Sequence, residues 1–272
     1  MFKKTLSIGD SQFHVIDHGQ GPPLLLVHGF PLNQSMWKFQ ISKFAKTHRV
    51  ICPDLAGFGL SQCDQPRATL QNHAEDLSQI LDALNVQERV IFCGLSMGGY
   101  IGWEFWKHYP EKISGIVACN TRAANDSPEV ARARLISAKS IFKTGTQVLA
   151  QQMAPRLIYG KPQELKTSIQ SALEQMIESA SPESVAAGQV AMSTRHDATS
   201  WLPMIDCPTL FVGGQYDQIT TAQEMSNNAA LIPNAQFVEI QGAGHLTPLE
   251  QPESFNTRVL EFLNSTHFRR PQ

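Results

Sequence analysis

The sequence of 272 residues lacks the features that mark several classes of protein. Its 22 basic and 24 acidic side chains leave a net charge of −2, so the chain has neither the basic surface of a nucleic-acid-binding protein nor an acidic tail. Its fully apolar runs are short, such as Leu24–Val27, whereas a membrane span needs about 20 apolar residues. The N-terminal segment has two lysines but no apolar stretch behind them, and therefore predicts no secretory signal.

Cysteine is also scarce. The five cysteines are scattered and have no CxxC spacing, which argues against a disulfide framework and against a zinc site. The nine histidines show no HxH or HExxH spacing, so we expect no metal site. Reduced thiols are typical of the cytoplasm, which is the location we predict. Hydrophobic residues make up 42% of the chain, which is ample for a large folded core.

The chain shows two different patterns of predicted secondary structure. In residues 1–120, strand-like runs alternate with helical patterns, and several runs are apolar throughout, which indicates strands covered on both faces. This order predicts a mostly parallel sheet with helices on both faces, and it resumes in residues 201–272. Residues 121–200 carry only helix signals, so we predict an α/β core with one helical insertion. Strands are expected at Thr5–Ile8, Phe13–Asp17, Leu24–Val27, Val50–Pro53, Val90–Cys93, Ile113–Cys119, Leu210–Val212 and Phe237–Ile240.

The most informative stretch is a serine between two glycines. Gly94-x-Ser96-x-Gly98 follows the strand Val90–Cys93 and precedes a helical pattern that starts at Met97. A sharp turn from strand to helix forces the serine into strained backbone geometry, and small residues on each side relieve the crowding. The helix N-terminus favours negative charge that develops there. A chance glycine-rich turn is the alternative, but the strand before it and the helix after it favour a nucleophile.

A nucleophilic serine needs a base, and the base needs an acid that orients it. After this kind of turn the chain order is serine, then aspartate or glutamate, then histidine. Asp217 follows the strand Leu210–Val212, at the edge where ligands bind in open α/β sheets. His245 lies in a glycine-rich loop after the strand Phe237–Ile240. We therefore predict Ser96, Asp217 and His245 as nucleophile, acid and base, with a surface loop histidine as the alternative for His245.

Two backbone N–H groups are predicted to bind the oxyanion that forms during acyl transfer. One belongs to Phe30, in the loop after the third predicted strand, and the other to Met97, which follows the nucleophile. Gly29 allows the backbone of the first loop to approach closely. His28 is predicted to brace this loop by hydrogen bonds rather than to act in catalysis. The glycine-rich loop at Asp54 lacks the ending of a phosphate loop, so we interpret it as a structural turn in which Asp54 binds backbone.

The segments HGFP, DLAGFGLS, GLSMGG, GGQYD and GAGH, in this order, resemble the α/β-hydrolase superfamily over essentially the whole chain. Residues 120–122 and 127–129 resemble the branch of the 3-oxoadipate enol-lactone hydrolases and carboxylesterases. The resemblance implies a mostly parallel eight-stranded sheet with a helical cap, residues 121–200, inserted after the sixth strand. Serine rather than aspartate at the turn argues against haloalkane dehalogenase and epoxide hydrolase chemistry.

We therefore expect a serine hydrolase that cleaves a small carboxylic ester or lactone through an acyl-enzyme. His245 would take the proton of Ser96, Asp217 would stabilise the imidazolium, and water would then release the acid. This mechanism needs no cofactor and no metal ion. Two alternatives use the same residues, namely hydrolysis of a C–C bond and cofactor-free perhydrolysis. A third alternative is a receptor that keeps the hydrolase fold for ligand binding.

Substrate choice is expected to depend on residues 121–200. Arg122 and Arg195 are candidates for binding a substrate carboxylate, and the alternative is a structural ion pair, for example between Arg195 and Asp197. Nothing in the sequence indicates an oligomeric state. Some apolar side chains of this segment are expected to pack on the core and the rest to line a pocket above Ser96, and the alternative is that all of them serve packing alone. The set is Leu135, Ile136, Ile141, Phe142, Leu149, Met153 and Met176.

Overall fold

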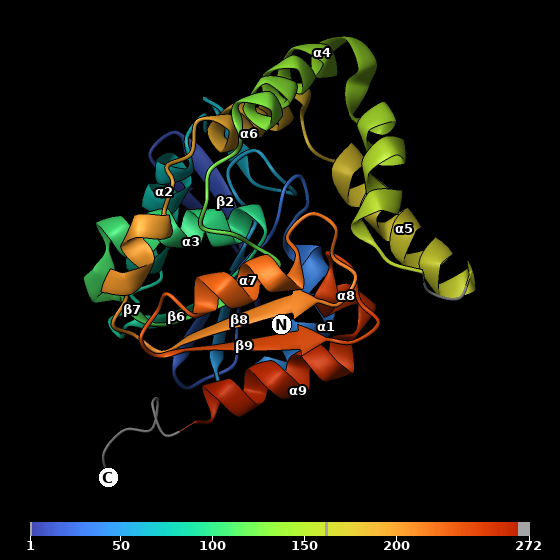
Figure 1. Cartoon of the computed structure of the whole chain (residues 1–272). Helices are drawn as coiled ribbons and strands as arrows, with labels where there is room; N and C mark the ends of the chain where they lie inside the picture. The colour runs from blue at the N-terminus through green and yellow to red at the C-terminus, as the bar shows by residue number, and fades with distance from the viewer. Residues whose placement is uncertain (1, 161–162, 266–272) are drawn as a thin grey trace.

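A computed structural model gives the structure of residues 2–160 and 163–265, without the side chains of residues 2 and 163–167. A twisted sheet carries helices on both faces, and a further group of helices lies beside it (Figure 1). Within the described residues, nine strands form one sheet in the order β1-β2-β4-β3-β6-β7-β8-β9, and the short strand β5 pairs with β2. The strands are β1 (Phe2–Ile8), β2 (Ser11–His18), β3 (Pro23–Val27), β4 (Arg49–Pro53), β5 (Gln62–Cys63), β6 (Val90–Leu95), β7 (Ile113–Cys119), β8 (Thr209–Gly214) and β9 (Ala235–Ile240).

The mostly parallel sheet is confirmed. Strands β4, β3, β6, β7, β8 and β9 pair in parallel, whereas β2 runs antiparallel to β1, β4 and β5. All eight predicted strands are present. The ninth, β5, was not predicted because a strand of two residues is too short to show a period.

Helices cover both faces of the sheet and explain its continuous apolar strands. The helices of the core are α1 (Lys38–Phe44), α2 (Leu70–Ala83), α3 (Met97–His108), α7 (Ala222–Ala229), α8 (Thr247–Glu250) and α9 (Pro252–Leu263). In β3, Leu25 and Val27 join the apolar cluster under α2, α3 and α7, whereas Leu24 and Leu26 join the cluster under α1 and α9. A strand that alternates between two covered faces has no polar side, as the sequence indicated.

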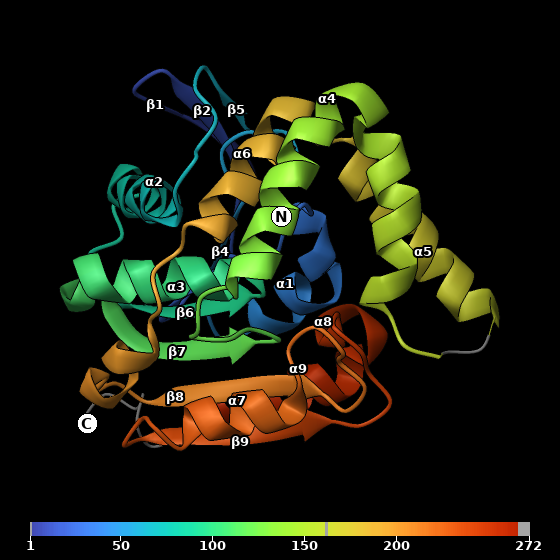
Figure 2. The same cartoon turned by 45° about the horizontal axis from the view of Figure 1, so that its top comes forward.

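In the described part of the chain, three α-helices and the 3₁₀ helix Thr199–Met204 lie between β7 and β8, where the sequence predicted only helices. Ser127 and Ser181 cap two of them with their side chains, and each is followed by proline at the first helical position. The longest helix bends at Gly145, which has φ 74° and ψ 168° (Figure 2). In the described ranges, no helix combines the length and the apolar character that a bilayer crossing requires. The three helices are α4 (Pro128–Leu157), α5 (Gln163–Glu178) and α6 (Pro182–Ser193).

Four of the five cysteines are buried, and Cys63 is partly buried. Cys52, Cys93 and Cys119 are fully buried in the apolar cluster under α1 and α9, where they pack as small core residues. All five cysteines are free thiols. Burial raises the pKa of the Cys52 thiol well above its ordinary value, so this group stays protonated and behaves as an apolar side chain.

Candidate active site

The serine turn has the strained geometry that the sequence predicted. Ser96 lies between β6 and α3 with φ 54° and ψ −114°, a backbone conformation that residues other than glycine rarely adopt. A Cβ at Gly94 would lie 2.4 Å from the carbonyl oxygen of Gly98, and a Cβ at Gly98 would lie 2.4 Å from that of Val27. Only glycine fits at either position. The N–H of Ser96 donates to the carbonyl of Cys119 at 2.9 Å, which fixes the turn to the neighbouring strand.

Asp217 follows β8, and hydrogen-bond donors surround its carboxylate. One oxygen accepts the backbone N–H groups of Ile219 and Thr220, and the other accepts the Thr220 hydroxyl at 2.7 Å and the Asn120 amide at 2.9 Å. Burial alone would raise the pKa of Asp217, but the charge of His245 and the hydrogen bonds outweigh it and hold the pKa well below its ordinary value. The carboxylate is therefore charged at neutral pH.

His245 lies in the loop between β9 and α8, and the structure brings it to Asp217. Its Nδ1 is 2.8 Å from Asp217 Oδ2, and both residues are buried. This contact occupies Nδ1 and leaves Nε2 as the nitrogen for a second partner. His245 and Ser96 line the same cavity, of about 70 Å³. The three residues predicted as nucleophile, acid and base thus come from three loops at the carboxyl edge of the sheet.

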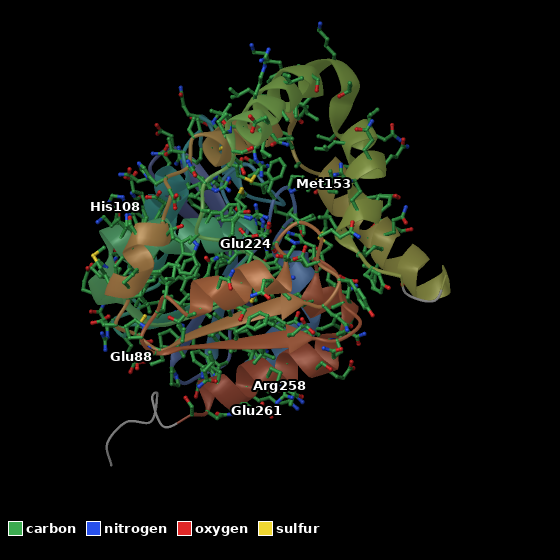
Figure 3. All side chains as sticks on the ribbon, in the orientation of Figure 1. Glu88, His108, Met153, Glu224, Arg258 and Glu261 are labelled. Atoms are coloured by element: carbon green, nitrogen blue, oxygen red, sulfur yellow. The ribbon has the colours of Figure 1, made fainter. Side chains whose placement is uncertain are left out.

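The walls of this cavity come from the core loops and from α4 and α6. Phe30 and Leu246 contribute from the core, and Met153, Leu157 and Met192 contribute from the helices. Figure 3 shows Met153 on the side of its helix that faces the core. The cavity is mainly apolar, as expected, but Met153 is the only one of the seven predicted side chains among the described lining residues. Three of the others are exposed instead, namely Leu135, Ile136 and Phe142.

The loop predicted to bind the oxyanion lies against the serine turn. A Cβ at Gly29 would lie 2.9 Å from the Leu95 side chain and 3.4 Å from Ser96 Cβ, so the glycine permits this approach. Phe30 follows in the loop and lines the cavity. Met97 is the first residue of α3, and a first helical residue has no acceptor for its N–H within the helix.

His28 and Asp54 hold these loops together. His28 Nε2 accepts the N–H of Leu55 at 3.0 Å, and its Nδ1 lies 3.0 Å from the carbonyl of the next residue. Burial lowers the pKa of His28, although the charge of Asp54 opposes this, so the ring is neutral. Asp54 accepts the backbone N–H groups of Gln34 and Leu60. The bracing roles predicted for both residues are confirmed.

Further polar groups around Asp217 were not singled out in the sequence. Asn120 follows β7 with φ 43°, and its amide donates to Asp217 and, at 3.2 Å, to the carbonyl of Gly244. Thr247 in turn donates its hydroxyl to the side chain of Asn120 at 2.7 Å. The position of Asn120 directly after a core strand was the available signal. Thr247 could not have been chosen, because its partner lies 127 residues away.

The two arginines expected at a substrate carboxylate are engaged by protein groups. Arg195 Nη1 lies 2.8 Å from Asp126 Oδ1, and the Arg195 side chain is only 3% exposed. Arg195 therefore forms a structural ion pair, which was the alternative interpretation, but its partner is Asp126 and not Asp197. Arg122 Nη2 lies 3.2 Å from Glu224 Oε2 of α7, and both side chains are partly exposed. Neither arginine is among the described residues that line the cavity.

The cation that does line the cavity is Arg134 of α4. Its Nε lies 2.5 Å from Asp126 Oδ2, and its Nη1 donates to Gln189 at 3.3 Å. Burial would raise the pKa of Asp126, but hydrogen bonds and charge from Arg134 and Arg195 lower it, so the carboxylate is ionised. Two guanidinium groups thus share one carboxylate, so the three side chains together carry a net charge of +1. A helical pattern does not show which of several arginines faces inward, so the sequence did not distinguish Arg134.

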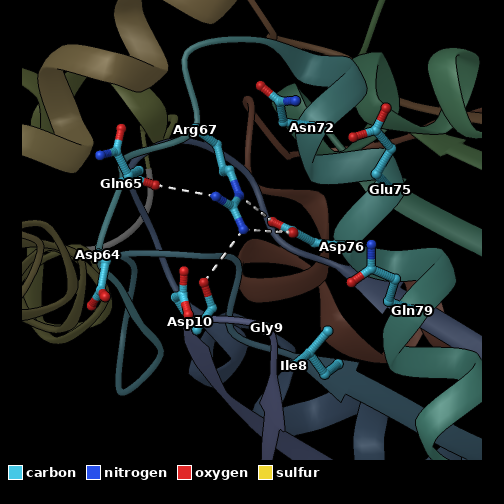
Figure 4. A pocket seen from close by; sticks show the side chains of 11 residues that line it. Ile8, Gly9, Asp10, Asp64, Gln65, Arg67, Asn72, Glu75, Asp76 and Gln79 are labelled. Carbon is cyan, nitrogen blue, oxygen red and sulfur yellow. Dashed lines mark hydrogen bonds and ion pairs between the residues drawn. The ribbon is translucent and has the colours of Figure 1, made fainter.

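A second hollow, of about 260 Å³, lies apart from Ser96, between the β1–β2 turn and α2 (Figure 4). Asp10 and Asp64 line it, and Arg67 crosses it. Arg67 binds both carboxylate oxygens of Asp76 at 2.9 Å and the hydroxyl of Ser11 at 3.3 Å, so it ties its loop to α2. Among the described residues, no group of three or more His, Cys, Asp or Glu side chains is arranged to hold a metal ion.

The chain is similar to known hydrolases in sequence and in structure. A family model described as alpha/beta hydrolase fold matches residues 22–252. The 3-oxoadipate enol-lactonase 2 of Acinetobacter baylyi is 28% identical over 262 residues, which are 95% of each chain. A thermophilic esterase from Thermogutta terrifontis, solved with malate bound, has a TM-score of 0.93 and 39% identity over 98% of this chain and 100% of its own. The enol-lactonase of Burkholderia xenovorans LB400 has a TM-score of 0.88 and 26% identity over 96% and 100%.

Proposed function

Because the chain belongs to the α/β-hydrolase family, in the branch of the enol-lactonases and esterases, we propose that it hydrolyses a small carboxylic ester or lactone with Ser96 as nucleophile. One observation carries the proposal. His245 bonds to the buried carboxylate of Asp217 and shares a small cavity with Ser96, which stands on a strained turn. Hydrolysis by an acyl-enzyme requires this set of a nucleophile, a base and an orienting acid.

Each group has one task in the proposed reaction. His245 Nε2 removes the proton of the Ser96 hydroxyl while the oxygen attacks the carbonyl carbon. Asp217 holds the proton of the imidazole on Nδ1 and stabilises the imidazolium. The imidazolium then gives its proton to the leaving alcohol, or to the alcohol end of an opened lactone. Water attacks the acyl-enzyme while His245 removes its proton, the bond from the acyl carbon to the Ser96 oxygen breaks, and the imidazolium returns the proton to that oxygen as the acid leaves.

Negative charge develops on the carbonyl oxygen of the substrate, and hydrogen-bond donors directed at that oxygen stabilise it. We propose that the N–H groups of Phe30 and Met97 bind the carbonyl oxygen as it becomes an oxyanion. The position of Met97 at the start of α3 supports this role, because N–H groups at a helix start favour negative charge. Gly29 and its close approach to the serine turn support the role of Phe30.

We also propose that residues 121–200 act as a cap that selects the substrate, over a core of residues 1–120 and 201–272. Met153, Leu157 and Met192 from this segment face the same cavity as Ser96, which supports the assignment. A pocket of mainly apolar side chains with one cation favours a short acyl or alcohol part that carries a carboxylate. The Thermogutta terrifontis esterase with bound malate is a relative with an organic acid bound.

A cytoplasmic location is part of the proposal. All five cysteines are free thiols, and free thiols persist where glutathione keeps them reduced. Fractionation of cells that produce the chain tests this location, and recovery of the protein outside the cytoplasmic fraction would contradict it.

The experiment that tests the function is a hydrolysis screen under multiple turnover. The panel contains esters of increasing acyl length, lactones, and vinylogous diketones for C–C cleavage, and peroxide is added in a parallel series for perhydrolysis. We expect many turnovers per molecule on esters or lactones, and a kcat lower by about 10⁴-fold or more with Ser96→Ala. A stoichiometric response, or preference for the diketones, would contradict the proposal.

Replacement of Arg134 is expected to separate charged from neutral substrates. Arg134→Gln removes the excess positive charge, so KM for esters that carry a carboxylate should rise roughly 10- to 100-fold, the range of a charge-assisted hydrogen bond. KM for neutral esters of the same length should change little. Arg132→Gln, at an exposed position of the same helix, is the matched control. An equal change for both ester series would show that Arg134 acts on structure alone.

A further inference from the structure

Glu250 is a buried carboxylate beside the proposed base. It ends the short helix α8 that follows His245, and it is 2% exposed. Its Oε1 accepts the N–H of Gly244 at 2.9 Å and the N–H of Leu246 at 3.0 Å. Gly244 and Leu246 are the residues on either side of His245. One oxygen thus fixes the backbone of the loop from which the imidazole projects.

The other oxygen reaches the end of α4. Glu250 Oε2 accepts the N–H of Tyr159 at 2.8 Å, and the N–H of His245 donates to the carbonyl of Leu157 at 3.1 Å. Figure 2 shows the end of α4 beside α8. The backbone N–H groups of residues 244, 245 and 246 are therefore all held, and the middle one is held by the proposed cap.

The loop that carries the proposed acid, Asp217, also contacts the chain at the end of α4. The ring of Tyr159 stacks on the ring of Tyr216, with centroids 3.7 Å apart and planes inclined by 18°. Tyr216 precedes Asp217, and its N–H donates to the carbonyl of Ala243 at 2.9 Å. The end of α4 thus contacts both loops that carry the proposed base and acid.

We propose that Glu250 is a positioning residue, which couples the end of the cap helix α4 to the orientation of His245. This inference rests on the proposed function of the Ser96 site. The imidazole needs a fixed angle to both Asp217 and Ser96, and an error of about 1 Å in such an arrangement costs about 100-fold in rate. The carboxylate supplies that fixed angle because it accepts three N–H groups from two segments that are far apart in the chain.

The test is Glu250→Gln, which keeps the volume of the side chain. An amide has one accepting oxygen, so whichever way it turns, at least one of the three N–H groups faces an NH₂ group and loses its acceptor. We expect kcat to fall about 10- to 100-fold with KM little changed, because the base is misaligned while the pocket walls stay. An unchanged kcat in a folded Glu250→Gln protein would overturn the proposal.

A second readout does not depend on turnover. The Nδ1 proton of His245, held between the ring and Asp217, gives a downfield proton resonance in NMR spectra. We expect this resonance to shift or broaden in Glu250→Gln. If the wild type hydrolyses nothing, the proposed function fails, and the resonance still decides the role of Glu250. An unaltered resonance in Glu250→Gln would count against positioning.

Two variants separate positioning from general destabilisation. Asp76→Asn weakens a comparable buried carboxylate, the partner of Arg67 in the hollow between the β1–β2 turn and α2 (Figure 4). It should lower the melting temperature and leave kcat and the resonance unchanged below that temperature. Tyr159→Ala removes only a half-exposed ring, so it folds even if Glu250→Gln does not, and kcat should fall about two- to tenfold. Equal losses of kcat in Asp76→Asn, or no loss in Tyr159→Ala, would contradict the coupling.

Discussion

Ser96→Ala is expected to lower kcat by about 10⁴- to 10⁶-fold while the protein keeps its fold. The hydroxyl makes the covalent bond to the substrate in the proposed mechanism, and no neighbouring group can replace it. Alanine has the same Cβ as serine, so the strained backbone with φ 54° costs no more than before. Steady-state kinetics on the best ester of the screen measure the loss, and the melting temperature monitors the fold.

Ser114→Ala is the control for this substitution. Ser114 lies near the start of β7, and its hydroxyl donates to the carbonyl of Arg89 at 3.3 Å. The start of a parallel strand is at the edge opposite the proposed site. We expect this variant to retain its activity. A Ser96→Ala protein with nearly full activity would contradict the assignment of the nucleophile.

His245→Gln is expected to remove both the activity and its dependence on pH at the acid side. In the wild type, kcat/KM should fall on the acid side of the pH profile, because an imidazole that is already protonated cannot accept the proton of Ser96. Asp217 does not produce this fall, since its pKa is held well below the ordinary value and it stays charged. Glutamine cannot act as a base, so kcat/KM should fall by about 10⁴-fold or more.

The measurement is kcat/KM from pH 5 to pH 9 for the wild type and the variant. His108→Gln is the control, because His108 lies at the end of α3 on the outside of the molecule (Figure 3). Its profile should match that of the wild type. If His245→Gln keeps measurable turnover and the same acid limb, another group is the base.

Much of the fold could be predicted because the local patterns agree with the global arrangement. The run Leu24–Val27 is apolar throughout since β3 is covered on both faces, and the serine turn at Ser96 needs glycine at fixed positions. The order of strands and helices then determined which loops meet at one edge of the sheet. Asp217 and His245 could be chosen on that basis, 28 residues apart in the chain.

The rest depends on pairing between distant segments, which no local pattern records. Arg134 and Arg195 both bind Asp126, and only their three-dimensional positions show which of them faces the cavity. The role of Glu250 rests on a contact with Tyr159, 91 residues away. Helical periodicity in residues 121–200 predicted helices but not their faces, so most of the side chains expected in the pocket lie elsewhere.

The most direct test of the proposed nucleophile is the site of covalent reaction with a serine-directed phosphonate. A phosphonate reacts with a serine oxygen that a base has activated, and the adduct resembles the tetrahedral intermediate. Mass spectrometry of the intact protein and of its peptides locates the label. We predict one adduct per chain, on Ser96, which forms slowly in His245→Gln and not at all in Ser96→Ala. A label on any other residue, or no label on a protein that hydrolyses esters, would contradict the account.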